Sequence, residues 1–263
     1  METKRLDILL VERGLVTSRE RAQARIMAKH VLVDGRPITK SGAKVPLEAK
    51  IVLRGEDLPY VSRGGLKLEK AITAFALDLN DKIVLDVGAS TGGFTDCVLQ
   101  NGARKVYAVD VGYGQLAWRL RQDPRVIVLE RTNIRHLDKS KLIPFPSMAC
   151  IDVSFISLQT VIPPVMEFLV GDRELVALIK PQFEVGRSRV GKGGIVREPS
   201  LHREVLSNIV ATVEQYLTCI ALDYSPIRGS KGNIEYLLYA RLSSPKLPLN
   251  IDQVVANAHA DLT

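Results

Sequence analysis

Four charged side chains, two lysines and two carboxylates, stand where apolar segments of the sequence begin or end. They are Lys67 in SRGGLK, Asp152 in CIDVSFISL, Lys180 in LIKPQFEVG and Glu235 in SKGNIEYLLY. Ligands of open α/β sheets bind beyond the carboxyl ends of the strands, so residues that are far apart in the chain meet at that rim. A lysine that carboxylates hold in place can orient a hydroxyl group and, while neutral, take up its proton. The set therefore suits transfer of an activated group to a hydroxyl.

Each of these residues also has a structural interpretation. A lysine at the end of a strand often extends its ammonium group into water, as Lys180 could. Asp152 could form a turn or cap the following helix, and Lys67 could be a surface residue of a helix. Glu235 could be a charge that protects an edge strand from aggregation. The order of the four residues around a glycine-rich turn favours the functional interpretation.

The glycine-rich turn follows a buried apolar run, in IVLDVGASTGGFTD. Gly88, Gly92 and Gly93 allow the backbone to approach a ligand closely. Asp110 ends the next apolar run, 22 residues after Gly88, and an acid at this distance suits the hydroxyl groups of a ribose. The glycine spacing is G-x-x-x-G-G rather than G-x-G-x-x-G, which argues against a dinucleotide. The alternative is a purely structural corner between a strand and a helix.

From about residue 62, apolar runs of strand length alternate with segments of helical periodicity. The predicted strands are 83–87, 105–109, 126–129, 147–152, 175–180, 219–224 and 234–241. The predicted helices lie near 93–101, 114–122, 157–169 and 200–217, after a leading helix in SRGGLKLEKAITAF. This alternation predicts an α/β fold with a doubly wound, mostly parallel sheet of seven strands. The last two strands are expected to pair antiparallel, and no element is predicted for residues 244–263.

Residues 1–60 have a different pattern, that of a separate module. A helix in RLDILLVERGL stops at Gly14, and the next helix, SRERAQARIMAKH, places Arg21, Arg25 and Lys29 on one face. VLVDGRPITK then predicts a hairpin with an Asp-Gly turn. The module holds 12 Lys and Arg against 8 Asp and Glu, more than half of the net charge of +7. The basic row can contact a polyanion or can be a solvated helix face.

The composition is typical of a soluble globular protein, with 46% hydrophobic and 25% charged residues. No apolar stretch approaches the ~20 residues of a membrane-spanning helix. Acids interrupt the apolar part of the N-terminus, unlike a secretory signal. The three widely spaced cysteines predict reduced thiols and a cytoplasmic location. The four histidines pair with no cysteine at metal-ligand spacing, so no metal site is expected.

The N-terminal module resembles the S4 RNA-binding domain over residues 5–45, from RLDILLVERGL through the Ser-Arg start of the second helix to VLVDGR. The resemblance implies binding of structured RNA through the basic helix face and the adjoining hairpin. The residues implied in RNA contact are Arg5, Arg19, Arg21, Arg25 and Lys29. On this basis the chain divides into an S4 domain, residues 1–60, and a second domain, residues 61–263.

The second domain resembles the class I methyltransferases, which have a Rossmann-like fold and use S-adenosylmethionine. The motifs that carry this resemblance are DVGASTGGFT and AVDVGYGQL, and they point to the FtsJ-like ribose methyltransferases. The resemblance implies that the methionine side of the cofactor is lined by Asp86, Gly88, Ser90, Gly92 and Phe94. It also implies that Asp110 holds the cofactor's ribose and that Asn133, in ERTN, lies near its adenine.

The order Lys-Asp-Lys-Glu matches the catalytic tetrad of the FtsJ-like 2′-O-methyltransferases. By that resemblance Lys180 is the central base and Asp152 orients it, while Lys67 and Glu235 position the hydroxyl. Two glycine-containing loops, PQFEVGRSRVGKGGIVREPS and PIRGSKGN, should project over the same rim. Their basic side chains are expected to contact phosphates, with plain solvation as the alternative. The residues are Arg187, Arg189, Lys192 and Arg228.

Other methyl acceptors would leave other marks after the fourth strand. Methylation of the amino groups of bases often shows an Asp/Asn-Pro-Pro-aromatic stretch there, where this chain has DVSFIS. Methylation of pyrimidine C5 needs a nucleophilic cysteine. Cys150 is expected inside the strand, as a packing residue rather than a nucleophile.

An S4 module followed by an FtsJ-like domain, with VSRGGLKL, ERTN, DVSFISL, KPQFEVG and GNIEY, resembles the hemolysin A (TlyA) family. That resemblance implies S-adenosylmethionine-dependent 2′-O-methylation of cytidine in ribosomal RNA of the small subunit, the large subunit or both. One alternative is a membrane-lytic haemolysin, against which the missing spanning segment speaks. Another is a non-catalytic RNA-binding factor of ribosome assembly, against which the complete tetrad speaks. The expected partners are ribosomal RNA and ribosomal subunits, without a membrane or a metal.

Overall fold

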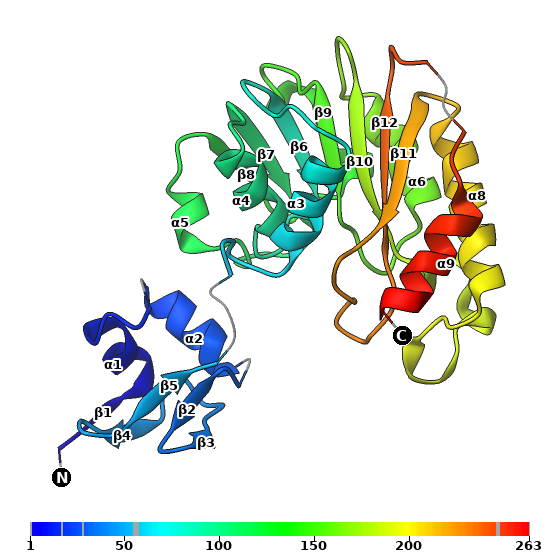
Figure 1. Ribbon diagram of the computed structural model, residues 1–263. Helices are drawn as coiled ribbons and strands as arrows, with labels where there is room; N and C mark the ends of the chain where they lie inside the picture. The colour runs from blue at the N-terminus through cyan, green and yellow to red at the C-terminus, as the bar shows by residue number, and fades with distance from the viewer. Residues whose placement is uncertain (1, 17, 28, 55–57, 246–247, 263) are drawn as a thin grey trace. The chain divides into compact units, whose positions relative to one another are not determined.

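The computed structural model describes residues 2–16, 18–27, 29–54, 58–245 and 248–262. Contacts along the chain divide it into two compact units, one up to Pro59 and one from Tyr60 onward. Figure 1 shows the elements of both units, coloured from blue at the N-terminus to red at the C-terminus. Within the described ranges, no helix combines the length and the apolar character that crossing a bilayer requires.

The first unit combines two short helices with two small antiparallel sheets. Its elements are β1 (Thr3–Arg5), α1 (Leu6–Glu12), α2 (Arg19–Met27), β2 (Val31–Val33), β3 (Arg36–Pro37), β4 (Lys44–Pro46) and β5 (Ile51–Leu53). β1 pairs with β4, and β2 lies between β3 and β5. The predicted hairpin is present, because β2 and β3 pair across a turn in which Asp34 has φ 48° and Gly35 has φ 80°. Two positive φ values are those of the turn type for which Asp-Gly is favoured.

A buried carboxylate ties the start of this unit to its second helix. Asp7 is fully buried and accepts hydrogen bonds from Arg5, from Arg19 at 2.9 Å and from Gln23 at 3.0 Å. The Arg5 guanidinium beside it, at 2.9 Å, holds the pKa of the Asp7 carboxyl well below its usual range. Arg5 and Arg19 therefore both bind a structural partner within the unit.

The second unit is an α/β domain built on a seven-stranded sheet. Its strands are β6 (Ile83–Val87), β7 (Lys105–Val109), β8 (Val126–Leu129), β9 (Met148–Ile151), β10 (Glu174–Ile179), β11 (Thr218–Tyr224) and β12 (Tyr236–Arg241). Its α-helices are α3 (Gly64–Ala74), α4 (Gly93–Gln100), α5 (Trp118–Arg121), α6 (Leu158–Met166), α7 (Pro181–Glu184), α8 (Pro199–Val213) and α9 (Ile251–Leu262). Its 3-10 turns are η1 (Ile134–His136), η2 (Lys139–Lys141), η3 (Arg187–Arg189) and η4 (Lys192–Gly194).

The strand order is β11-β12-β10-β9-β6-β7-β8. β12 is antiparallel to both of its neighbours, and the other pairings are parallel. The carboxyl ends of β6, β9 and β10 therefore lie at one edge of the sheet, and β12 begins at that edge. The chain order reverses between β6 and β9, the kind of switch point at which α/β proteins bind ligands. The predicted doubly wound, mostly parallel fold is confirmed.

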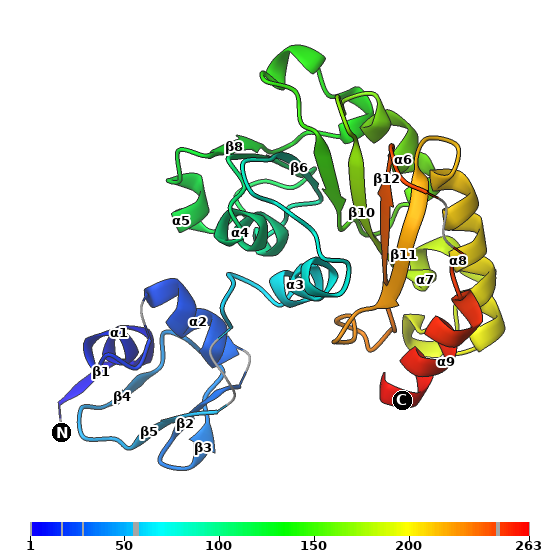
Figure 2. The same ribbon diagram turned by 45° about the horizontal axis from the view of Figure 1, so that its top comes forward.

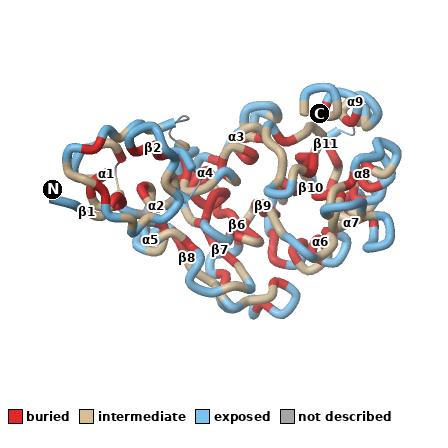
Figure 3. The backbone as a smooth tube through the Cα atoms, turned by 90° about the horizontal axis from the view of Figure 1, so that it is seen from below, coloured by how far each residue is buried: buried red, intermediate tan, exposed pale blue. Residues whose placement is uncertain are grey.

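Helices cover both faces of this sheet (Figure 2). α3, α4 and α5 pack on one face through residues such as Leu68 and Val98, and α6, α8 and α9 pack on the other through residues such as Val161 and Leu206. Figure 3 shows buried residues along β6, β9 and β10, and every residue of these three strands is buried. Burial on both faces explains why these strands are continuous apolar runs in the sequence.

The seven strands lie within two residues of their predicted limits. The helices differ more. α5 is shorter than the predicted 114–122 because residues 114–117 are irregular. Gly114 has φ 71° and donates its N–H to Glu130 at 2.9 Å. α8 ends at Val213 rather than at 217, and α9 occupies a stretch for which the sequence pattern predicts no element.

Candidate active site

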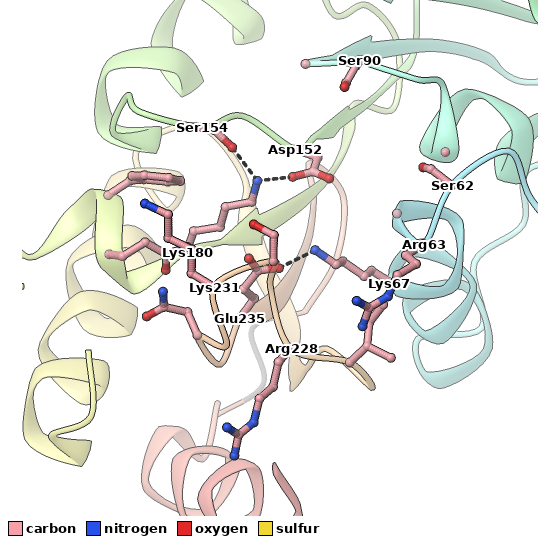
Figure 4. A pocket seen from close by; sticks show the side chains of 18 of the residues that line it. Ser62, Arg63, Lys67, Ser90, Asp152, Ser154, Lys180, Arg228, Lys231 and Glu235 are labelled. Carbon is pink, nitrogen blue, oxygen red and sulfur yellow. Dashed lines mark hydrogen bonds and ion pairs between the residues drawn. The ribbon is translucent and has the colours of Figure 1, made fainter. Parts of the chain in front are cut away.

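A cavity of about 660 Å³ opens at the carboxyl edge of the seven-stranded sheet. Its walls come from the glycine-rich loop after β6, the start of α3, the segments after β9 and β10, and the loop before β12. The four charged residues singled out from the sequence, Lys67, Asp152, Lys180 and Glu235, all line it (Figure 4). A cavity of this size is within the range that holds small ligands.

A short turn after β10 presents Lys180 to this cavity. Lys180 directly follows the strand, and Pro181 is the first residue of α7. Proline has no N–H for a sheet ladder, so the strand ends and the chain turns. The Glu184 carboxylate secures α7, because it accepts hydrogen bonds from Ser157 Oγ at 2.6 Å and from the N–H of Leu158 at 2.9 Å. The turn is thereby fixed to the start of α6.

The Lys180 side chain is nearly enclosed, with 8% of the residue exposed. Its Nζ lies 2.6 Å from Asp152 Oδ1 and donates a hydrogen bond to Ser154 Oγ at 3.0 Å. Asp152 and Ser154 follow β9, and the parallel pairing of β9 with β10 brings them to the lysine. The contact with Asp152 is an ion pair, and Asp152 Oδ1 has no hydrogen-bond partner among the described residues.

Lys67 and Glu235 form a second ion pair in the same cavity. The Lys67 Nζ lies 2.5 Å from Glu235 Oε2, and the two side chains are 11% and 3% exposed. Lys67 comes from the first turns of α3, and Glu235 directly precedes β12. Because β12 runs against its neighbours, its first residues lie at the edge where the parallel strands end. A Cβ at Gly229 would collide with the Glu235 carboxylate, so the loop before β12 is shaped around this group.

The loop after β6 packs tightly against the segment that carries Asp152. Gly88 has φ 87°, and an added Cβ would lie 2.5 Å from the carbonyl oxygen of Asp152, so only glycine fits there. The Asp110 carboxylate, at the end of β7, holds the loop from the other side. It accepts hydrogen bonds from the N–H of Ser90 at 2.8 Å and from the N–H of Gly112 at 2.7 Å.

Asp86 lies in β6, two residues before Gly88, and is fully buried. Its Oδ2 accepts a hydrogen bond from Thr95 Oγ1 at 2.5 Å, whereas its Oδ1 has no hydrogen-bond partner among the described residues. Burial raises the pKa of Asp86 to about 7. An unpartnered buried carboxylate oxygen next to a glycine-rich loop suits a ligand that offers a donor or a positive charge.

The variant Asp86→Asn is expected to gain stability relative to the wild-type protein as the pH rises. The pKa of Asp86 is about 7 in the folded protein and ~3.9 in an unfolded chain. Between these values the folded state keeps a proton that the unfolded state has lost, so the stability contributed by Asp86 is complete below the lower pKa and is lost as the pH rises through the higher one. Asparagine has no such proton. Urea unfolding at about pH 4.5 and about pH 8 should therefore favour the variant at the higher pH, by up to about 3 kcal/mol. A stability difference that does not change with pH would contradict the raised pKa.

Comparison with known families identifies the second unit. The sequence model of the FtsJ-like methyltransferase family matches residues 60–242, and that of the S4 domain matches residues 4–51. The chain belongs to the FtsJ-like methyltransferase family. A relative from Bacillus subtilis, named as a suspected rRNA methyltransferase, is 52% identical over 239 residues, which cover 90% of this chain and 85% of the relative.

Two further proteins resemble this FtsJ-like methyltransferase along nearly its whole length. A relative from Mycobacterium tuberculosis, named 16S/23S rRNA (cytidine-2′-O)-methyltransferase TlyA, is 44% identical over 244 residues, covering 92% of this chain and 91% of the relative. The solved structure of a Streptococcus thermophilus protein, named as a suspected hemolysin, is 47% identical and has a TM-score of 0.77, covering 99% of this chain and 97% of that chain. The resemblance to the hemolysin A (TlyA) family is thereby confirmed.

The cofactor residues predicted for this FtsJ-like methyltransferase lie in different places around the cavity. Gly88, Ser90 and Phe94 line it. Gly92 faces away, since an added Cβ there would meet the side chains of Leu116 and Leu120. Asp86, Asp110 and Asn133 are not among the lining residues. The Asn133 side chain caps η1 by accepting a hydrogen bond from the N–H of Arg135 at 3.1 Å.

The basic residues predicted to contact RNA are also divided. Arg228 lines the cavity, and so does the neighbouring Lys231. Arg187 and Lys192 are exposed on the loop after α7, and Arg189 pairs with Glu204 at 2.7 Å.

The remaining predicted RNA residues belong to the first unit. Arg5 and Arg19 bind Asp7 and keep side chains that are 42% and 51% exposed. Arg21 and Arg25 are half-buried on α2, and Lys29 is exposed just after it.

Several residues of the cavity wall are absent from the set predicted from the sequence, among them Arg63, Ser154 and Phe155. Phe155 is 86% exposed, has φ 64°, and its ring centroid lies 5.0 Å from that of Phe183. An exposed aromatic residue with a left-handed backbone conformation at a pocket wall is unusual. The only sequence signal for it is its place three residues after Asp152, in DVSF.

Cys150 lies in β9 and is fully buried. Burial raises the pKa of its thiol well above the ordinary value, so the group stays protonated and packs rather than attacks. All three cysteines are buried and unbridged. In the described part of the chain, no group of three or more His, Cys, Asp or Glu side chains is arranged to hold a metal ion.

Proposed function

We propose that this protein transfers the methyl group of S-adenosylmethionine to the 2′-hydroxyl of a cytidine in ribosomal RNA, and that it does so in the cytoplasm. The observation that carries the proposal is the presence of two ion pairs, Lys180–Asp152 and Lys67–Glu235, in one cavity beside the glycine-rich loop. The cytidine and the ribosomal RNA come from the name of the Mycobacterium tuberculosis relative.

The glycine-rich loop fits S-adenosylmethionine by three features. Gly88 brings the backbone to the cavity without a side chain, Phe94 adds an apolar surface, and Asp86, fully buried two residues before Gly88, keeps a carboxylate oxygen without a partner among the described residues. When bound, the cofactor supplies an electrophilic methyl group that needs no further activation. The residues proposed to hold it are Asp86, Gly88, Ser90, Gly92 and Phe94 on the methionine side, Asp110 at the ribose and Asn133 near the adenine.

Lys180 is proposed to hold the attacking hydroxyl and to take up its proton. The ion pair with Asp152 and the hydrogen bond to Ser154 hold Nζ in place before the substrate arrives. Uptake of a proton requires the neutral amine. Asp152, 2.6 Å from Nζ, is placed to orient this group and to balance the charge that forms on it.

Lys67 and Glu235 are proposed to position the ribose from the other wall. Each of the two charges is buried and has the other as its ion-pair partner, which restricts both side chains to one geometry. Glu235 offers acceptor oxygens and Lys67 offers donors, so the pair can bind a ribose hydroxyl from both sides.

The charge and surface of the cavity suit a nucleotide within RNA. Five cationic side chains line it, against the two carboxylates of Asp152 and Glu235; they are Arg63, Lys67, Lys180, Arg228 and Lys231. An excess of positive charge suits phosphate groups. The exposed ring of Phe155 offers a face for a nucleobase, the usual way in which proteins hold unpaired bases.

Replacing Arg21 and Arg25 by alanine is expected to weaken RNA binding without lowering cofactor binding. Each lysine or arginine that neutralises a phosphate steepens the fall of affinity with salt by about one unit of logarithmic slope. The double variant should therefore bind RNA more weakly and with a slope that is flatter by up to about two units. Fluorescence anisotropy with labelled ribosomal RNA at several salt concentrations measures both quantities.

The matched control for this pair is Lys44→Ala with Lys50→Ala. It removes the same charge from exposed positions of the same unit that are not part of α2. If both double variants lose the same affinity and slope, the α2 face has no special role in RNA binding.

The reaction itself is tested on ribosomal RNA from cells that lack this protein. Nucleoside analysis should show the loss of 2′-O-methylcytidine, and supplying the wild-type protein should restore it. Supplying Lys180→Ala should not. A nucleoside profile that is the same with and without the protein would count against the proposal.

A further inference from the structure

The loop between α7 and α8 forms part of the cavity wall although it has little regular structure. Val190 and Gly194 line the cavity, and Gly193 and Gly194 both have φ 79°. The loop closes on itself through a hydrogen bond from the N–H of Gly191 to the carbonyl oxygen of Ile195 at 3.1 Å. A glycine-rich loop of this kind has a high conformational entropy, so something outside it must hold it in place.

Asn233 holds the loop through its side-chain amide. Its Oδ1 accepts a hydrogen bond from the N–H of Val196 at 3.0 Å, and its Nδ2 donates to the carbonyl oxygen of Gly194 at 2.8 Å. The amide therefore bonds to the loop backbone as a neighbouring peptide group would. Asn233 is 2% exposed and lies two residues before Glu235. The segment around Asn233 consequently positions both the loop in the cavity wall and Glu235.

His202, on α8, bonds to the backbone carbonyl of Val196, the residue whose N–H binds Asn233. Its Nε2 lies 3.0 Å from the carbonyl oxygen of Val196, and its Nδ1 lies 2.6 Å from the Tyr236 hydroxyl. The ring is fully buried, and burial lowers the pKa of His202 to about 4, so the ring is neutral near pH 7. A carbonyl can only accept, which places the proton on Nε2 and leaves Nδ1 to accept from Tyr236.

The C-terminal helix completes this arrangement. His259, on α9, places its Nε2 3.3 Å from the Nδ1 of His202, and the two ring centroids are 4.8 Å apart. α9 is held by the buried Val255 and Ala258. The helix lies beyond residue 242, where the match to the FtsJ-like methyltransferase family ends. It therefore lies outside the matched residues, and its contact with the cavity wall is indirect, through His202.

We propose that Asn233 and His202 are positioning residues that hold the Gly191–Val196 loop as the wall against which the RNA substrate binds. The hydrogen bonds of these two side chains to Gly194 and Val196 form a latch, and α9 stabilises this latch through His259. None of the three side chains supplies a reacting group. Asn233 and Tyr236 lie on either side of Glu235. The beginning of β12, which positions Glu235, is therefore coupled to the Gly191–Val196 loop. The effect on RNA rests on the proposed function, whereas the effect on loop order does not.

The test combines hydrogen exchange with kinetics on the full-length protein. In Asn233→Ala the backbone amide of Val196 should exchange about tenfold faster, the change expected when one hydrogen bond is lost. The KM for ribosomal RNA should rise by up to the same factor, with a smaller change in kcat and an unchanged Kd for S-adenosylmethionine. His259→Ala, a substitution of a half-buried residue that should not impair folding, is expected to show the same pattern more weakly.

Two further variants separate positioning from a general loss of stability. His202→Gln keeps a donor for Val196 and an acceptor for Tyr236, so it should restore most of what His202→Leu loses. Val205→Ala removes packing from the same helix, where Val205 is 2% exposed, and should leave Val196 exchange and the KM for RNA unchanged.

Unchanged Val196 exchange in Asn233→Ala and His259→Ala would overturn the latch. Faster exchange with an unchanged KM for RNA would overturn the role of the loop as the RNA-binding wall. If the wild-type protein does not methylate ribosomal RNA, the proposed function fails, while the exchange data still decide whether the latch exists.

Discussion

Replacing Lys180 by alanine is expected to slow methyl transfer by roughly 10³-fold, the size of effect that a positioned acid or base contributes. The substitution removes the only side chain whose nitrogen contacts both Asp152 and Ser154 among the described residues. Binding of S-adenosylmethionine and of RNA should stay close to the wild-type values, because the glycine-rich loop and α2 are untouched. Single-turnover transfer with saturating RNA and cofactor measures the chemical step directly.

Two control variants distinguish proton uptake by Lys180 from an effect of its charge. Lys180→Arg keeps the positive charge and the ion pair, but a guanidinium cannot give up its proton near neutral pH, so this variant should be nearly as slow as Lys180→Ala. Lys70→Ala removes another ion-paired lysine, bound to Asp223 at 2.9 Å and outside the cavity, and should transfer at the wild-type rate. A fully active Lys180→Arg would mean that the charge matters and that the side chain is not the base.

Breaking the Lys67–Glu235 pair is expected to cost about 3–5 kcal/mol of folding free energy, because it leaves one buried charge without its partner. Glu235→Leu and Lys67→Met should each show this loss in urea unfolding followed by circular dichroism. The double variant should recover most of the lost stability, because apolar side chains of similar size can replace a buried pair at little cost.

Activity should behave differently from stability in the same three variants. If the pair positions the ribose, all three remain inactive, including the double variant with its restored stability. An active double variant would show that the pair only fills space in the fold. A double variant that loses the sum of both single losses would show that the two charges do not act as a pair.

Much of the candidate site could be predicted because a parallel sheet gathers strand ends at one rim. Asp152 and Lys180 directly follow neighbouring strands, and Glu235 directly precedes the one strand that runs the other way. Apolar runs mark these strands clearly, since every residue of β6, β9 and β10 is buried. A charged residue that interrupts such a run is visible in the sequence without any knowledge of its partner.

The partners themselves could not be predicted, because they come from distant parts of the chain. Nothing near Arg19 in the sequence marks Asp7, 12 residues earlier, as the fully buried carboxylate that it binds. Asn233 bonds to a loop more than 35 residues away, and only the folded backbone shows that its amide fits there. α9 has few buried residues, so its apolar pattern is too weak to predict a helix.

The exposure of Phe155 has a similar explanation. A phenylalanine within DVSFIS is expected to be buried on general grounds, yet the residue is 86% exposed. The tight turn that brings Asp152 and Ser154 to Lys180 directs the following residue outward, with a positive φ. The geometry of the site, rather than the local sequence, determines its position.

The most direct test of the account is transfer of tritium-labelled methyl groups from S-adenosylmethionine by the purified protein. The substrates are naked ribosomal RNA, isolated ribosomal subunits and whole ribosomes, and the labelled nucleotide is then mapped. We expect label on the 2′-oxygen of one or a few cytidines in at least one of these substrates, and none with Lys180→Ala. Label on a base would contradict it, and so would the absence of label in all three substrates from a protein that permeabilises lipid vesicles.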